Sequence, residues 1–356
     1  MFYLGGVGLA FFLTLLLLSK SNKTTADKIL AAWLFTVTLH ILFYYFRQAN
    51  LYSQLLAVDF PLPLVHGPFL LIYTLALTRG YVSKIAMLHF LPALCVLLYL
   101  IPFFTLPTEE KISIFKNQGA GYEVFNMIRT VANLSSGVVY VILASMVLSK
   151  HRKAILHQFS STEKINLQWL QYLSYWIGLI WLFVLFGNEE MIYVSTVFFI
   201  LFIGFFGIRQ VGIFHSPQTV HVPEQGGEVE AAEKKKYQKS GLSSDNSESL
   251  HRNLSLLMSN EKLFRESELS LTELAKRLNT QPNYLSRVIN EREGKNFYDY
   301  INTLRIEEFK RLAANPDSKK YTLLGLAQEC GFNSKSSFNR YFKKMTGKSP
   351  SEFMQG

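Results

Sequence analysis

Apolar residues form long runs separated by short polar stretches through the first 214 residues, and this pattern stops near His215. A helix that crosses the hydrocarbon core of a bilayer needs about 20 mostly apolar residues. Seven runs approach that length: Phe2–Ser19, Ile29–Phe46, Pro61–Leu77, Ile85–Leu106, Thr130–Ser149, Leu170–Gly187 and Met191–Phe214. The third is the least regular, because prolines interrupt its start. The pattern predicts an all-α protein in which residues 1–214 form a seven-helix polytopic membrane bundle.

The distribution of charge separates this region from the rest of the chain. Residues 1–214 contain 14 Lys and Arg and 8 Asp and Glu, whereas the remaining 142 residues contain 22 and 18. One soluble globular domain is therefore excluded. A disulfide-rich secreted fold is excluded as well, because the 2 cysteines, Cys95 and Cys330, fall in different regions.

The basic residues between the runs predict an orientation. The loops after the first, third and fifth runs hold 9 Lys and Arg, and the other three loops hold 4. Because positive charge favours the cytoplasmic side, the N-terminus is expected outside and the C-terminal domain inside. The start does not read as a cleaved signal peptide, since Lys20, Lys23 and Lys28 follow the apolar run instead of preceding it.

Few side chains in the membrane region carry chemistry. Ionisable groups within a bilayer are costly and often functional, so His66 and His89 are candidates for a ligand pocket. His66 precedes Gly67 and Pro68, which permit a close backbone approach and a bend. The alternative is that these histidines only pack helices together. The sequence has no H-E-x-x-H or G-x-S-x-G motif, so we expect no catalytic residue, no metal and no cofactor.

Residues 215–250 are expected to form a cytoplasmic linker. The helical periodicity disappears there, and prolines, glycines and a Ser/Asp/Asn cluster replace it. The basic run Lys234–Lys236 lies beside acidic residues. It is either a solvated segment or a contact for anionic lipid headgroups.

Residues 251–356 contain two predicted helix-turn-helix units. In the first, about 271–291, Ser270 and Glu273 form a capping box, and Asn279 suits a tight left-handed turn before Pro282 starts the second helix. In the second, about 323–345, Gly331 takes the turn position. An amphipathic helix at about 297–314 joins them. At 1.5 Å per residue it is about 27 Å long, against about 34 Å for one DNA turn.

The second unit resembles the DNA-binding domain of the AraC/XylS family. Gly331–Pro350 meets every fixed position of the pattern G-F-x-S-x-S-x-F-x-R-x-F-K-x-x-x-G-x-[ST]-P. The first unit matches less tightly and has Asn279 where a small residue is common. The resemblance implies a bacterial transcription regulator that binds double-stranded promoter DNA. Family members often carry a soluble effector domain, which the membrane helices replace here, so no effector-binding residues can be transferred.

Helical geometry indicates which side chains face outward on the two recognition helices. They are Gln281, Asn283, Ser286, Arg287 and Asn290 on the first, and Asn333, Lys335, Ser336, Asn339, Arg340, Lys343 and the following Lys348 on the second. Base-edge contacts give specificity and phosphate contacts give affinity. We expect base contacts from Arg287, Lys335, Ser336 and Asn339. We expect phosphate contacts from Arg340, Lys343 and Lys348. Cys330 is expected in the core and not as a redox sensor.

The sequence therefore indicates a multi-pass protein of the bacterial inner membrane that regulates transcription by one-component signalling. The expected partners are promoter DNA, the lipid bilayer, a second copy in a homodimer, RNA polymerase and an unknown signal ligand. One alternative is a membrane transporter or receptor with an autoregulatory DNA-binding tail. Another is a membrane enzyme, for which the sequence offers no nucleophile or metal cluster.

Overall fold

The computed structural model describes residues 2–210, 244–315 and 320–355. Within these ranges the chain is helical and contains no β-strand, apart from one isolated bridge between Phe159 and Ser270. The chain divides into two compact units. The first contains Met1–Ser149 and Leu167–Val222, and the second contains Lys150–Asn166 and Pro223–Gly356. A short segment from the middle of the chain therefore folds with the C-terminal region.

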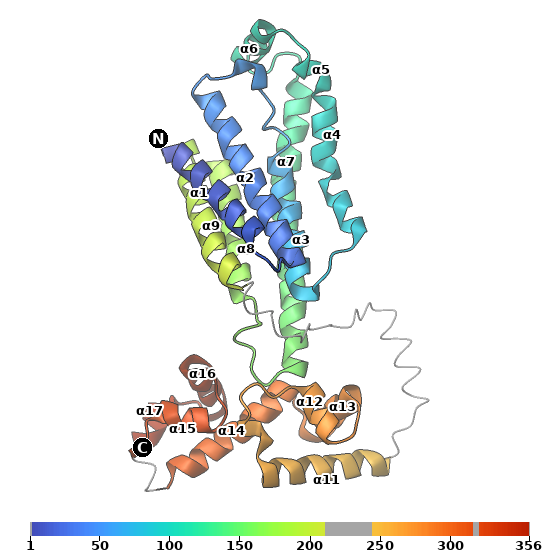
Figure 1. The fold of residues 1–356 in the computed structure, drawn as a ribbon, viewed down its shortest axis with the longest axis vertical. Helices are drawn as coiled ribbons and strands as arrows, with labels where there is room; N and C mark the ends of the chain where they lie inside the picture. Colours follow the sequence, from blue (N-terminus) through green and yellow to red (C-terminus); the bar gives the residue numbers. More distant parts are fainter. Residues whose placement is uncertain (1, 211–243, 316–319, 356) are drawn as a thin grey trace. The chain divides into compact units, whose positions relative to one another are not determined.

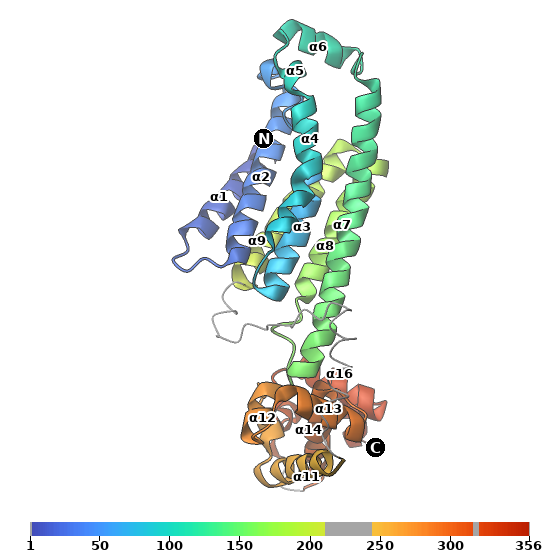
Figure 2. The same cartoon turned by 90° about the vertical axis from the view of Figure 1, so that its right-hand side faces the viewer.

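The first unit is a bundle of apolar helices that run side by side (Figure 1). Its helices are α1 (Phe2–Ser19), α2 (Thr25–Gln48), α3 (Pro63–Arg79), α4 (Leu91–Tyr99), α5 (Ile101–Phe104), α6 (Thr108–Lys116), α7 (Glu123–Gln158, whose last residues belong to the second unit), α8 (Gln168–Phe186) and α9 (Glu189–Gln210), with the short 3-10 helices η1 (Ser53–Leu55) and η2 (Lys84–Phe90). Trp33, Tyr73 and Leu170 lie in its buried core. Figure 2 shows α6 joining the ends of α5 and α7.

Four of these helices are long and apolar enough to span a membrane: α2, α7, α8 and the part of α9 from Glu190 to Gly207. The residues Tyr3–Ser19 and Lys84–Tyr99 form shorter apolar helices. Each of the seven apolar runs overlaps helical structure within the described residues, which end at residue 210 in the seventh run. The helix α7 extends beyond the predicted Thr130–Ser149 at both ends. The chain therefore has several apolar helices, and a count of seven spans stays a prediction.

The interrupted third run forms α3, which begins at Pro63 and contains Pro68. Proline suits the first turn of a helix because its missing N–H has no intrahelical acceptor there. A Cβ atom built on Gly67 would lie 2.4 Å from Cδ2 of Tyr140 in α7. Only glycine permits so close an approach of the two helices.

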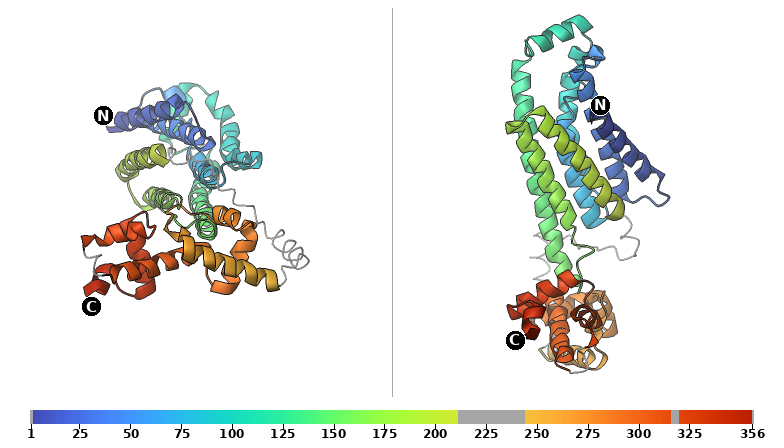
Figure 3. Two further views of the ribbon diagram at one scale, coloured as in Figure 1. Left: turned by 60° about the horizontal axis from the view of Figure 1, so that its bottom comes forward. Right: turned by 90° about the vertical axis from the view of Figure 1, so that its left-hand side faces the viewer.

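The second unit consists of small helices arranged around α14 (Figure 3). They are α11 (Ser244–Glu261), η4 (Leu263–Arg265), α12 (Leu271–Arg277), α13 (Pro282–Glu293), α14 (Phe297–Ala313), α15 (Leu323–Glu329), α16 (Lys335–Thr346) and α17 (Pro350–Gln355). Phe297 and Ile301 of α14 join the core around α12 and α13, whereas Ile306 and Phe309 join the core around α15 and α16. The helix α14 therefore belongs to both halves.

The helix α11 begins inside the predicted linker of residues 215–250. Helical structure starts at Ser244, the first residue of α11. Leu254 and Met258 of this helix pack into the core around α12 and α13. Residues 244–250 of the predicted linker are therefore helical, and the linker itself stays a prediction. The rest of the predicted linker up to residue 243, with the basic run Lys234–Lys236, lies outside the described residues.

Candidate DNA-binding surface

The pair α12 and α13 has the turn that the sequence predicts. The Ser270 hydroxyl oxygen accepts from the Glu273 backbone N–H at 3.2 Å and so caps α12. Asn279 adopts φ +50°, the left-handed conformation that Asn tolerates better than most residues. Pro282 begins α13, and Leu285 lies in the core. These contacts fix the outward face of α13.

The pair α15 and α16 repeats this arrangement. The Ser334 hydroxyl oxygen accepts from the Ser337 backbone N–H at 3.2 Å and caps α16. Phe338 and Phe342 are buried beneath that helix. Cys330 is also buried, and burial raises the pKa of its thiol to about 12. The prediction that Cys330 is a core residue is therefore confirmed.

The predicted DNA contacts lie on the outward faces of α13 and α16 or beside them. Ser286 and Asn339 are half-buried, and the others are exposed: Gln281, Asn283, Arg287, Asn290, Asn333, Lys335, Ser336, Arg340, Lys343 and Lys348. Some already have polar partners. Arg287 forms an ion pair with Glu291, from Nε to Oε1 at 2.7 Å, on the same helix. Contact with DNA stays a prediction for each of these residues.

The part of the second unit that precedes α8, Lys150–Asn166, is called here the α7–α8 segment. Within it the Ser160 backbone N–H donates to the Leu269 carbonyl oxygen at 3.1 Å, and the Ser160 hydroxyl donates to the same oxygen at 2.7 Å. Leu156 packs against the core around α16. The segment is therefore joined to the C-terminal helices by backbone hydrogen bonds and by apolar contact.

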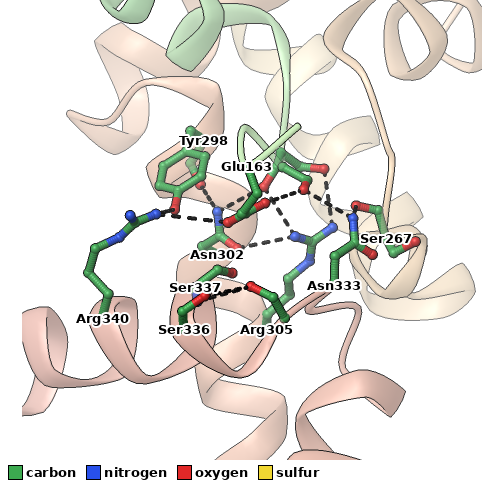
Figure 4. A network of polar contacts seen from close by, with 12 residues as sticks. Glu163, Ser267, Tyr298, Asn302, Arg305, Asn333, Ser336, Ser337 and Arg340 are labelled. Atoms are coloured by element: carbon green, nitrogen blue, oxygen red, sulfur yellow. Dashed lines mark hydrogen bonds and ion pairs between the residues drawn. The ribbon is translucent and has the colours of Figure 1, made fainter. Parts of the chain in front are cut away.

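Arg305 is at the centre of a polar network that fixes this segment (Figure 4). Its side chain projects from α14 and is 1% exposed. The two terminal nitrogens donate to the Ser160 carbonyl at 3.2 Å and to the Ser160 hydroxyl oxygen at 3.1 Å. It also donates to the carbonyls of Phe264 at 2.6 Å and Glu266 at 2.8 Å, and to the Asn302 side-chain oxygen at 3.1 Å. Burial lowers the pKa of Arg305 to about 10, so the guanidinium stays charged at neutral pH.

The same segment contacts two predicted DNA-binding residues. The Asn333 side-chain amide donates to the Ser161 hydroxyl oxygen at 3.0 Å. The Arg340 guanidinium lies 3.8 Å from the Glu163 carboxylate (Figure 4). Burial by itself would raise the pKa of Glu163. Hydrogen bonds from Ser161 and from its own backbone, together with the nearby Arg340, lower the pKa by more than burial raises it, so the net shift is downward. Glu163 is therefore a carboxylate at neutral pH.

The hydrophobic and polar pattern of the sequence does not predict this network. The available signal was Arg305 itself, which follows Ile301 by four residues and so falls on the buried face of α14. A charged residue on an apolar face needs polar partners. The partner Ser160 lies 145 residues away, and nothing local in the sequence identifies it.

The two candidate ligand-pocket histidines take part in hydrogen bonds between helices of the first unit. His66 Nδ1 accepts from Trp33 Nε1 at 3.3 Å, and His66 Nε2 lies 2.8 Å from His40 Nδ1. His89 Nδ1 lies 3.0 Å from the Tyr140 hydroxyl. This structure does not place the two histidines in one common site, and their role in ligand binding stays a prediction.

Comparisons with known proteins match part of the chain. A helix-turn-helix domain family matches residues 274–356. The regulator YtdP of Bacillus subtilis is 33% identical over 90 residues, which cover 25% of this chain and 11% of that protein. The Msm operon regulatory protein of Streptococcus mutans is 30% identical, and the regulator YijO of Escherichia coli is 34% identical, each over 87 residues, 24% of this chain and 30% of the relative. No solved structure matches.

Residues 274–356 therefore carry a helix-turn-helix domain, and membership of the AraC/XylS family stays a prediction. The matched segments span less than a third of each of these relatives. The names of these relatives describe them as regulators.

Proposed function

We propose that this protein is a membrane-bound, sequence-specific DNA-binding regulator that carries a signal from a bacterial inner membrane to a promoter within one chain. The helix-turn-helix domain supports DNA binding. Four helices that are long and apolar enough to span a bilayer support the membrane location. In this proposal seven helices span the membrane, with the N-terminus outside and the C-terminal domain in the cytoplasm, as the basic loops predict.

In the proposed complex, α12–α13 and α15–α16 are two helix-turn-helix units, and α13 and α16 enter successive major grooves. Arg287, Lys335, Ser336 and Asn339 read base edges, while Arg340, Lys343 and Lys348 contact phosphates. The 17 residues of α14 give about 26 Å between the units, close to one turn of DNA.

The observation that supports signalling most strongly is the position of the α7–α8 segment. It joins two helices that are long and apolar enough to span a bilayer, yet its residues fold with the DNA-binding domain. A movement of α7 or α8 would therefore strain the contacts between Ser160 and Arg305 directly. The signal needs no route through the linker. A hydrogen bond to a charged group contributes about 1.5–3 kcal/mol, so breaking two of them can change the state of the domain.

The segment also restrains side chains that are proposed to contact DNA. Ser161 accepts from Asn333, and Glu163 attracts Arg340. While these contacts exist, Glu163 places a negative charge beside a group that would approach a phosphate, and like charges repel. We therefore propose that the contacted state binds DNA weakly and that the signal releases the segment.

Two further partners belong to the proposal. A homodimer would present four helix-turn-helix units, and the second copy would gain affinity through effective concentration. A regulator bound beside a promoter would also contact RNA polymerase.

The test is genome-wide DNA occupancy of the tagged full-length protein, after fractionation shows that it sediments with membranes. We expect a few sharp promoter peaks, which the double variant Arg287→Ala/Asn339→Ala removes. The control is Arg252→Ala, which removes an exposed positive charge from α11 and none of the proposed DNA contacts. Recovery of the protein in the soluble fraction would contradict the membrane part. A double variant with unchanged peaks would contradict the assigned reading residues.

A further inference from the structure

The first unit contains a cavity of about 320 Å³. Aromatic side chains form much of its lining, among them Phe60, Phe103, Phe115, Tyr122 and Phe125. These residues belong to the stretch before α3 and to α5, α6 and the start of α7. Its volume is at the lower end of the range for small-molecule sites, about 300–1,000 Å³. Neither His66 nor His89 lines it.

The lining residue Arg129 uses only part of the hydrogen-bonding capacity of its guanidinium. The Arg129 guanidinium stacks on the Phe60 ring, with Cζ 3.8 Å from the ring centroid. One terminal nitrogen reaches the Asn126 side-chain oxygen at 3.5 Å, at the limit of a hydrogen bond. Nε of Arg129 is buried and has no hydrogen-bond partner in the described structure. A buried donor of this kind indicates a missing acceptor.

The charges around the cavity favour an anion. The carboxylate of Asp59 forms an ion pair with Arg47, and the same negative charge also stabilises the Arg129 guanidinium. Lys111 is 4% exposed, and its ammonium donates to two backbone carbonyls and to no carboxylate among the described contacts. The other acidic residues of this region, Glu109, Glu110 and Glu123, are exposed. The positive groups in this region, Arg47, Lys111 and Arg129, therefore outnumber its one buried carboxylate, Asp59.

We propose that this cavity binds a small amphiphilic carboxylate, with its carboxylate on Arg129 and its apolar body among the aromatic rings. A guanidinium pairs with a planar carboxylate through two parallel hydrogen bonds, which would satisfy the buried Nε. A cationic ligand is disfavoured by the same three positive charges, although aromatic rings alone would accept one. This inference rests on the proposed function, because it gives the chemical class of the signal, and the predicted orientation exposes residues 107–129 to the outside.

The experiment measures binding to the purified full chain in nanodiscs by isothermal titration calorimetry, with empty nanodiscs as the baseline. The probe is 3-phenylpropionate, and the matched neutral compound is 3-phenylpropionamide, which has the same shape and no charge. We expect saturable binding of the carboxylate and at least tenfold weaker binding of the amide. Equal affinity of the two compounds, or no saturable binding of the carboxylate, would overturn the proposal.

Two variants test the contribution of the Arg129 charge and that of the cavity volume separately. Arg129→Gln should weaken carboxylate binding at least tenfold, whereas Arg79→Gln, which removes a positive charge at the end of α3, should leave it unchanged. Ile114→Trp fills the cavity and keeps Arg129, so it should also abolish binding, even if Arg129→Gln fails to fold. Unchanged binding in both cavity variants would refute the site.

This assay contains no DNA, so the two proposals fail separately. Binding of 3-phenylpropionate by a protein that occupies no promoter would support the site and contradict the proposed regulator. Promoter occupancy by a protein that shows no saturable binding would support the regulator and contradict the site.

Discussion

The contact between the α7–α8 segment and the DNA-binding domain can be weakened by removing one oxygen atom. Ser160→Ala deletes a hydroxyl that donates to the Leu269 carbonyl at 2.7 Å and accepts from Arg305 at 3.1 Å. A neutral hydrogen bond contributes about 1 kcal/mol and one to a charged group about 1.5–3 kcal/mol. Since the Ser160 backbone contacts remain, only these two contributions are lost, and we expect opening of the segment to become easier by about 2.5–4 kcal/mol. At 1.4 kcal/mol per factor of ten, this corresponds to about 60- to 700-fold.

Hydrogen–deuterium exchange of the full chain in nanodiscs measures this opening directly. The Ser160 backbone N–H is bonded to Leu269, so it exchanges only when the segment leaves the domain. Peptides covering residues 158–164 should lose protection by about the calculated factor in Ser160→Ala. The control is Lys164→Ala in the same segment. Its ion pair with Glu268 is 65% and 69% exposed, and such pairs contribute little.

Equal protection in wild type and Ser160→Ala would refute the reasoning, because the buried hydroxyl would then contribute nothing to docking. A larger effect from Lys164→Ala than from Ser160→Ala would refute it as well. If the segment restrains DNA binding, Ser160→Ala should also increase promoter occupancy without any added signal.

Three further predictions concern the DNA-binding domain. Gly331→Ala should destabilise the domain by more than about 2 kcal/mol in thermal unfolding, because Gly331 has φ +97° and its Cβ would lie 2.7 Å from the Phe264 carbonyl oxygen; an unchanged melting temperature would contradict this. Hydrogen bonds from Arg311, Lys262 and Arg265 hold the pKa of Glu308 well below its ordinary value, against the opposing effect of burial. Because the folded pKa is depressed, this stabilisation is present above the ordinary pKa near 4.5 and is lost as pH falls below it, and Glu308→Gln should flatten the acid side of the stability profile. Cys330 should resist iodoacetamide at pH 8 in the folded protein and react after unfolding, because burial raises its pKa to about 12; rapid labelling of the native chain would contradict this.

Local backbone requirements made the two helix pairs predictable. Asn279 and Gly331 have the positive φ angles that tight turns need, and Ser270 caps the helix that it precedes. Each of these features depends on residues within a few positions, so single side chains indicate them.

The contacts of Arg305 and the lining of the cavity could not be predicted in the same way. Ser160 is a common polar residue in a loop, and it acquires a role only because the chain returns to it after 145 residues. The cavity lies where the stretch before α3, α5, α6 and the start of α7 meet, and no sequence period indicates that rings from these parts surround Arg129. Packing between distant elements decides both features.

Because the α7–α8 segment folds with the second unit, it limits where the chain can be cut and fused to another protein. A chimera that joins residues 251–356 to a foreign membrane protein would leave Arg305 without both Ser160 acceptors in a site that is 1% exposed. Residues 251–356 transferred alone would therefore lack the contacts that are proposed to restrain DNA binding. A graft that keeps this restraint must also carry residues 150–166, although residues 167–250 lie between the two stretches.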